Sequence, residues 1–247
     1  MDWGRAKTIL IVSFLFLNLL LGYQMWASRW DQSNSVTETA LNKEETHKIL
    51  ADKSIRVLNE VPKDTPKLKQ VSVKFDDKYS HSEIVTFATP IKYINLLGKK
   101  RVGAIISKTP IENAKQYQLD NALSKNDVYV YHQMLDEIPM FDVTLTLFDK
   151  KGEITGYKQA YVEVQSGEEQ KEEKIISAYT AIRSLADKYL PKGAAIMDVK
   201  LGYHGKRFDS QTHTMLPFWR VILTDGEIYY VQAFTGAIEG NQEQAKE

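Results

Sequence analysis

The pattern of hydrophobic and polar positions separates an apolar N-terminal segment from a long remainder of short, alternating segments. Residues 8–28 contain no charged residue, and Arg5 and Lys7 precede them. About 20 apolar residues in a helix span the roughly 30 Å hydrocarbon core of a bilayer. The pattern therefore predicts a transmembrane helix over 8–28. The positive-inside rule places residues 1–7 in the cytoplasm and the rest of the chain on the extracytoplasmic side.

A cleaved signal peptide is the alternative interpretation of this segment. Its apolar region usually has about 7–15 residues and ends in small residues at the cleavage site. Here the segment ends in Met25, Trp26 and Ala27, and the two large side chains fit such a site poorly. Tyr23 and Trp30 lie where an interfacial aromatic belt is expected. We therefore favour a permanent single-pass anchor in the cell membrane.

One face of the predicted membrane helix carries a candidate interface with a partner helix. Its residues follow i, i+4, i+7 and i+11 spacing: Ile11, Leu15, Asn18 and Gly22. The asparagine amide can form a hydrogen bond across a helix pair, and a glycine lets two backbones approach closely. An isolated asparagine that the lipid tolerates is the alternative explanation.

Residues 29–65 are predicted to form a stalk and a juxtamembrane helix. They begin with a polar stretch, after which apolar residues recur at helical spacing: Ala51, Ile55 and Leu58. This spacing predicts a helix over 42–60 that ends at Val61-Pro62. A solvated stalk helix, a packed first helix and a partner-binding helix all remain open interpretations.

Strand patterns dominate the next hundred residues. β-Branched and aromatic residues between turn-like breaks predict strands at 69–75, 83–88, 91–97, 101–107, 127–135, 140–149 and 154–165. The mixed stretch 110–124 is expected to hold a short helix. Asp149-Lys150-Lys151-Gly152 is typical of a hairpin loop between two of the strands.

The last third of the chain begins with a strong helix signal. Ser166 and Glu169 match a capping box, apolar residues then recur every three or four positions, and Pro191-Lys192-Gly193 predicts the end of the helix. Strands are predicted at 194–204, 218–224 and 227–234, with Asp225-Gly226 as a hairpin turn. The last two strands and the following turn supply a candidate hairpin core, formed by Trp219, Val221, Ile228, Tyr230, Phe234 and Gly236.

These elements predict an α+β fold, in which one transmembrane helix precedes a mainly antiparallel sheet with covering helices. From residue 166 the predicted order is helix, strand, strand, strand. A meander of three antiparallel strands needs one covered face, and the amphipathic helix can supply that cover. Residues 110–165 loosely repeat that order. We therefore expect two related extracytoplasmic α+β units, 66–165 and 166–247.

The net charge and the absence of cysteine exclude several classes of function. The 247 residues include 32 basic and 32 acidic side chains, so the formal net charge is zero. We expect no binding of nucleic acid, because no basic stripe is present to attract it. The chain also has no cysteine, which excludes disulfides, thiolate catalysis and cysteine-ligated metals.

Candidate chemistry is sparse. His204 and His213 flank a loop that contains Asp209, and these three residues could in principle bind a metal. We favour solvated loop histidines, because no compact metal-binding spacing and no hydrolase or phosphate-binding motif is present. The many adjacent acidic residues fit surface turns. The sequence therefore predicts no catalytic residue, no metal site and no cofactor.

Both ends of the chain resemble the YycI family, also called WalI. The resemblance is carried by MDWGRAKTILIVSFLFLNLLLGYQ at the start and PFWRVILTDGEIYYVQAFTGAIEG at the end. The final hairpin also resembles the PepSY-type pattern, in which a strand leads to a turn containing Thr-Gly. The layout of a basic stub, a single helix and an extracytoplasmic α+β region is similar throughout.

This resemblance implies a non-enzymatic, membrane-anchored regulator in a low-GC Gram-positive bacterium. YycI proteins are accessory proteins of the WalK–WalR (YycG–YycF) two-component system, which controls cell-wall homeostasis. They act with YycH (WalH) and contact the sensor histidine kinase WalK, partly through transmembrane helices. Their fold resembles the C-terminal domains of YycH. The family provides no catalytic residues to carry over, and homo- or hetero-oligomers are consistent with this role.

Two other functions remain open at the level of sequence. One is an anchored cell-wall-associated module, either an enzyme or a PepSY-like protease inhibitor, and converging carboxylates in a cleft would support it. The other is a ligand sensor with a pocket between the two α+β units, which a buried apolar pocket with a few polar groups would support.

Overall fold

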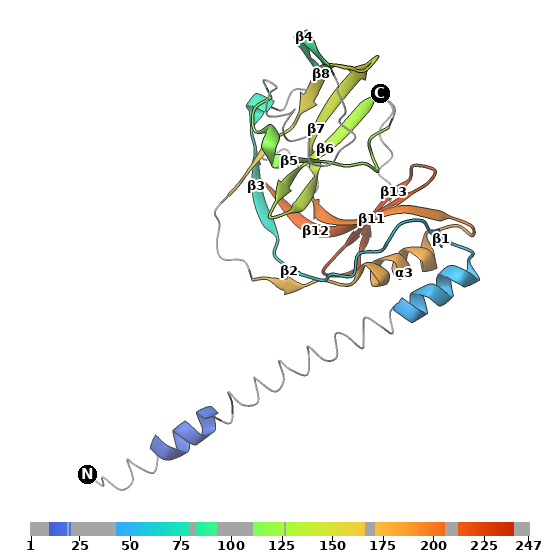
Figure 1. Ribbon diagram of the computed structural model, residues 1–247. Helices are drawn as coiled ribbons and strands as arrows, with labels where there is room; N and C mark the ends of the chain where they lie inside the picture. Colours follow the sequence, from blue (N-terminus) through green and yellow to red (C-terminus); the bar gives the residue numbers. More distant parts are fainter. Residues whose placement is uncertain are drawn as a thin grey trace. The chain divides into compact units, whose positions relative to one another are not determined.

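The structure is a computed structural model that describes residues 10–18, 20, 43–79, 83–92, 111–125, 127–165, 171–205 and 212–239 (Figure 1). The chain divides into two compact units, Met1–Lys48 and Ile49–Glu247. Residues 10–18 and 20 are helical. Among the described residues, no helix combines the length and the apolar character needed to cross a bilayer.

The helix predicted over 42–60 is shorter in the structure, where it covers residues 43–52. The chain turns at Ser54, which has a φ of 55°, and Ile55 enters the core. The next residues form β1 (Arg56–Val57), which pairs in parallel with β11 (Ala195–His204). Pairing with a distant strand therefore overrides the helical spacing. Leu58, counted with the apolar helix face, is 54% exposed.

The predicted strands between 69 and 165 are largely confirmed. Three expectations change, and the first concerns 154–165, where the predicted single strand is divided into two strands, 153–159 and 162–164. The segments 83–88 and 91–97 contribute to one strand rather than two, and 93–97 and 101–107 lie outside the described residues. The helix expected in 110–124 is a single 3-10 turn followed by a short strand. The elements are β2 (Lys67–Leu68), β3 (Val71–Phe75), η1 (Asp77–Tyr79), β4 (Val85–Lys92), η2 (Ala114–Gln116), β5 (Tyr117–Leu119), β6 (Val128–Leu135), β7 (Ile138–Lys150), β8 (Glu153–Gln159) and β9 (Val162–Val164).

The hairpin predicted at residues 149–152 is confirmed between β7 and β8. Lys151 and Gly152 have φ angles of 60° and 82°, a conformation that glycine adopts without strain. The Asp149 carboxylate accepts a hydrogen bond of 2.7 Å from the Gly152 N–H. A local side-chain bond and a permissive glycine thus set this turn.

The helix predicted to start at the Ser166–Glu169 capping box starts eleven residues later, so that prediction is wrong. Helix α3 covers Ala178–Lys188, and Ser177 is its N-cap, because the Ser177 side chain accepts a hydrogen bond from the Thr180 N–H. The backbone before the helix forms hydrogen bonds with strands instead. Strand β10 (Glu173–Lys174) pairs with β2, and the Ile176 N–H donates a hydrogen bond to the Ala233 carbonyl, which follows β13. The predicted end at Pro191-Lys192-Gly193 is confirmed by the helix boundary.

The C-terminal meander predicted after the helix is confirmed. Strand β11 pairs antiparallel with β12 (Thr212–Leu223), which pairs with β13 (Ile228–Gln232) across the predicted Asp225-Gly226 turn. Strand β14 (Ile238–Glu239) follows. Helix α3 lies against this meander (Figure 1). The helix and one sheet face form an apolar core that includes Ile182, Leu185, Ala186, Ile196, Trp219, Val221, Leu223, Tyr229 and Val231.

The described strands join into one twelve-stranded network, whose main path runs β14-β13-β12-β11-β7-β6-β5. A second core lies on β5–β8 and includes Tyr131, Leu145, Leu147 and Ile154. A third forms around β3 and includes Val73, Met140, Val143, Tyr203 and Met215. The fold is thus α+β. The division into two related units at 165/166 stays a prediction, and strands from both sides of it share this network.

Candidate functional site

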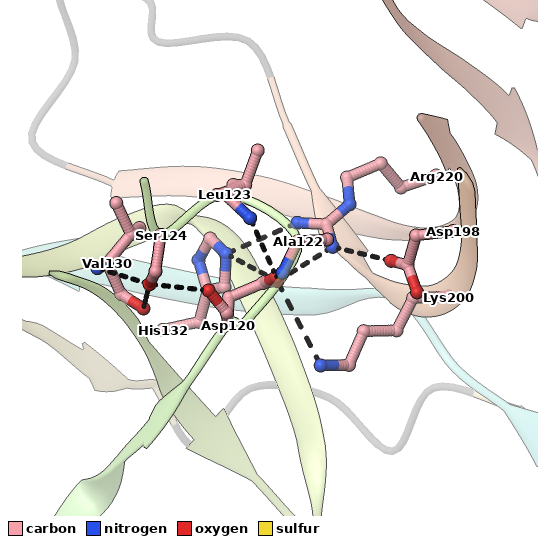
Figure 2. A network of polar contacts seen from close by, with 9 residues as sticks. All are labelled: Asp120, Ala122, Leu123, Ser124, Val130, His132, Asp198, Lys200 and Arg220. Carbon is pink, nitrogen blue, oxygen red and sulfur yellow. Dashed lines mark hydrogen bonds and ion pairs between the residues drawn. The ribbon is translucent and has the colours of Figure 1, made fainter. Parts of the chain in front are cut away.

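A charged cluster of side chains lies on the meander (Figure 2). Its centre is Arg220 on β12, whose neighbours Trp219 and Val221 face the helix. Successive side chains of a strand point to opposite faces, so Arg220 points away from α3. It is 0% exposed. A buried arginine requires charged partners, which other strands supply.

Asp120, which follows β5, is the main partner. Its Oδ2 accepts a 2.7 Å hydrogen bond from Arg220 Nη2 and lies 3.2 Å from His132 Nε2. Its Oδ1 accepts hydrogen bonds from the backbone N–H groups of Ala122 and Leu123. The turn after β5 therefore wraps around the carboxylate and presents it to β12 (Figure 2).

Arg220 is held on several sides. Its Nη2 donates to Asp198 Oδ2 at 3.1 Å, and its Nη1 lies 3.3 Å from His132 Nε2. The guanidinium carbon lies 4.6 Å from the ring centroid of Phe141, a cation–π arrangement. Within the part of the chain that the structure describes, two buried side-chain atoms have no hydrogen-bond partner, His132 Nδ1 and Arg220 Nε.

Charges in the cluster balance when His132 is neutral, because Arg220 and Lys200 face Asp120 and Asp198. Lys200 Nζ lies 3.9 Å from Asp120 Oδ2. Burial by itself raises the pKa of Asp120, but the hydrogen bond from His132 and the charges of Arg220 and Lys200 outweigh it and hold the pKa well below its ordinary value. Asp120 is therefore ionised at neutral pH. We refer to these five residues as the Asp120–Arg220 network.

This depressed pKa predicts a contribution to stability that acid removes. A carboxylate with a lower pKa in the folded state stabilises the fold above its unfolded pKa, near 3.9, and loses that contribution as the pH falls through the folded value. We expect the free energy of unfolding of the native chain to fall towards that of an Asp120→Asn variant between about pH 4 and pH 2. Urea unfolding from pH 7 down to pH 2 measures this difference. A constant difference over that range would contradict it.

A second polar contact lies nearer the edge of the meander. The His204 Nδ1 lies 2.9 and 3.0 Å from the two carboxylate oxygens of Asp142, and its Nε2 lies 3.7 Å from Glu239 Oε2. The ring stacks on Tyr230 with centroids 4.0 Å apart. Burial, followed by the charge of Asp142, raises the pKa of Tyr230 to about 12, so its hydroxyl stays protonated at neutral pH.

The expectation that His204 and His213 are solvated loop residues is wrong. Both are buried, at the end of β11 and the start of β12. His204 binds Asp142, and the His213 ring lies edge-on to Phe75. Asp209, the third residue of the metal hypothesis, lies outside the described residues. Among those that are described, no group of three or more metal-ligating side chains occurs.

The residues of the candidate hairpin core lie on two faces of the sheet. Trp219 and Val221 are fully buried against α3. In the register of β12 with β13, Ile222 pairs with Ile228 and Arg220 pairs with Tyr230. Ile228 and Tyr230 therefore belong to the face of the charged cluster, whereas Tyr229 and Val231 face the helix. Phe234 packs against the helix-facing core, and Gly236 has a φ of 74°.

The candidate membrane interface lies in the N-terminal unit. Ile11, Leu15 and Asn18 fall in the helical stretch 10–18, and all three are exposed. Their spacing places them on one face of this helix. Gly22 lies outside the described residues.

Sequence reasoning missed the Asp120–Arg220 network, although one signal was present. Arg220 interrupts the apolar run Phe218–Leu223, and a charge within a continuous hydrophobic strand predicts a buried ion pair. The residue that pairs with Arg220 could not be predicted from the sequence in the same way. Asp120 is 100 positions away in the sequence, and its neighbours resemble an ordinary polar turn.

Comparison with known proteins gives one family match. The model of the family described as YycI protein matches residues 32–234. No curated protein matches the chain. Among solved structures, an uncharacterized protein from Eubacterium rectale ATCC 33656 is similar with 14% sequence identity and a TM-score of 0.36. The match covers 70% of this chain and 62% of that protein, so the chain spans less than two thirds of its length.

Proposed function

The chain belongs to the YycI family of regulatory accessory proteins of the YycG/WalK two-component system, and we propose that it regulates the sensor kinase directly, from a membrane anchor and without catalysis. The match over residues 32–234 carries this proposal, because it covers nearly all of the region after the predicted membrane helix. The proposed partners are the kinase WalK (YycG) and the accessory protein YycH (WalH).

The exposed apolar side chains of the N-terminal helical stretch support the anchor. Each of its large apolar residues is between 49% and 71% exposed: Leu10, Ile11, Val12, Phe14, Leu15, Phe16 and Leu17. Successive helical residues are about 100° apart, so these side chains cover the whole circumference. Exposing such an apolar surface to water is unfavourable. A helix can instead expose it to lipid, because its backbone N–H and C=O groups are hydrogen-bonded within the helix. We propose that the membrane helix extends over residues 8–28.

Regulation by such a protein requires a preference between kinase states. An accessory protein shifts the kinase equilibrium only if it binds one state more tightly than the other. A difference of about 1.4 kcal/mol changes the ratio of states tenfold. Membrane-helix contacts and extracytoplasmic contacts can each contribute, and we propose that YycH binds as a further component.

Photo-crosslinking in native membranes tests the proposed partnership. A photoreactive amino acid at position 15, on the candidate interface, is expected to form an adduct with WalK or YycH, because this face is proposed to contact a partner helix. The same group at position 13, about 200° from Ile11 around the helix, is the control and is expected to give much less adduct. Recovery of neither protein, from either position or by co-purification, would refute the proposed function.

Substitutions on the interface give a graded prediction. Asn18→Leu is expected to weaken recovery of the partner about threefold, since hydrogen bonds between membrane helices average roughly 0.6 kcal/mol. Gly22→Leu is expected to weaken it at least as much, because a large side chain separates the two backbones. Quantitative co-purification measures both effects. Ser13→Leu, a polar-to-leucine change on the opposite face, is the matched control and should leave recovery unchanged.

A further inference from the structure

We propose that the compact unit Ile49–Glu247, called the ectodomain below, opens reversibly between β7 and β11. We propose that the Asp120–Arg220 network is the latch that holds it closed. One moving part is the β4–β8 ribbon, formed by strands β4 to β8. The other is the C-terminal meander, formed by β11 to β14 together with α3. The boundary between β7 and β11 is called the seam below. The latch belongs to the ectodomain alone and does not depend on which partner the protein binds.

Few backbone bonds hold the seam. Among the described residues, a single register pair, Tyr203 with Met140, joins β11 to β7. By contrast, β6 and β7 share seven register pairs and β11 and β12 share eight. The ladder within each part is therefore extensive, and the ladder between the two parts is minimal.

Side chains close the seam instead. The Phe141 ring of β7 lies directly on Gly202 of β11, where an added Cβ would be only 2.3 Å from the ring. Beside it, Asp120 and His132 from the ribbon meet Arg220 and its partners from the meander (Figure 2). Charged groups that separate into water regain hydration. The third core also spans the seam, with Met140 on β7 and Tyr203 on β11, and the His204–Asp142 pair joins the same two strands. The Asp120–Arg220 network is the part of this contact whose separation water compensates.

Two polar atoms of the closed network also lack hydrogen-bond partners. His132 Nδ1 and Arg220 Nε are buried and lack partners among the described residues. A buried polar atom without a partner carries a desolvation penalty that water removes. Both atoms gain hydrogen bonds with water when the seam opens, so this part of the closed state favours opening.

Strand β3 can serve as the hinge, because it pairs with the meander and with β9, the strand that directly follows the ribbon in the chain. It joins the start of β12 through residues 212–215 and joins β9 through residues 162–164. At roughly 3.3 Å per residue, Arg220 lies about 16 Å along β12 from Met215, the last residue paired with β3. A latch at that distance from the hinge controls the angle between the two parts.

Native-state hydrogen exchange of the full chain in detergent micelles tests this latch. The amides that bond across the seam at the Tyr203–Met140 pair are expected to exchange at least tenfold faster than amides of β12–β13, because the seam opens without global unfolding and leaves the ladders within each part intact. Gly202→Ala inserts a methyl group under the Phe141 ring and props the seam open. It is expected to raise the exchange rates at the Tyr203–Met140 pair at least a further tenfold while the β12–β13 rates stay within twofold.

Ile182→Val is the matched control, because it removes one methyl group from the core beneath α3 and leaves the seam untouched. It is expected to change the exchange rates of the meander and not to widen the difference between the two sets of amides. If the wild-type amides at the Tyr203–Met140 pair and those of β12–β13 share one opening rate, the latch is refuted. This wild-type result decides the question even if Gly202→Ala fails to fold, and it is independent of kinase binding.

Discussion

Replacing Arg220 with methionine is expected to lower the free energy of unfolding by about 3–5 kcal/mol, the usual cost of removing one partner of a buried ion pair. Arg220 is fully buried, and Asp120 is 2% exposed. Without the guanidinium, burial would raise the pKa of Asp120 with only His132 and Lys200 left to oppose it. Urea unfolding at pH 7, followed by circular dichroism of the full chain in detergent, measures the loss.

Two further variants separate the loss of an ion pair from a loss of packing. The double variant Arg220→Met/Asp120→Leu removes both main charges and is expected to recover most of the stability, because no unpaired anion remains in the centre. Asp198→Asn is expected to cost much less than Arg220→Met, since the Asp198 side chain is 26% exposed and is hydrated by solvent. A loss below about 1 kcal/mol for Arg220→Met would show that the network is energetically unimportant.

Elements set by local chemistry were predictable from the sequence. The β7–β8 turn is specified by Asp149 and Gly152, and the last hairpin by Asp225-Gly226, so a few neighbouring residues determine the backbone. Elements set by distant pairing were not. Residues 56–57 belong to a segment with helical spacing but pair with β11, and the backbone before Ser177 bonds to the sheet instead of starting the helix.

The candidate hairpin core shows a different limit. Alternation along one strand correctly groups Trp219 with Val221, and alternation along the next groups Ile228 with Tyr230. It does not give the register between the strands, which decides whether the two groups share a face. The observed register places Val231 opposite Trp219. Tyr230 therefore joins the charged face, and the sequence-based core combined residues from both sides of one sheet.

The same limit applies to the Asp120–Arg220 network. A buried cation within an apolar strand can be recognised in the sequence, because its burial demands an anion. The identity of that anion depends on how the β5 turn folds over the meander. That arrangement depends on how β7 meets β11, where one backbone pair and the fit of Phe141 over Gly202 are among the contacts. Neither feature has a local sequence signal.

Replacement of residues 8–28 by an unrelated membrane helix of equal length is expected to abolish regulation of the kinase. The ectodomain would remain anchored on the same side, since the basic residues before the segment are kept. The proposed contacts of Ile11, Leu15, Asn18 and Gly22 would be lost. A reporter of WalR-dependent transcription is then expected to read the same as in a strain that lacks the protein.

A graft distinguishes a specific interface from a general requirement for the native helix. Placing Ile11, Leu15, Asn18 and Gly22 at the same positions of the unrelated helix is expected to restore most of the lost output, because these residues form one face. Moving the same four residue types to the opposite face is the control and should restore none. If the plain replacement leaves the output unchanged, the membrane helix is only a tether. Regulation must then act through the ectodomain, where a partner that prefers the open or the closed seam would shift its population.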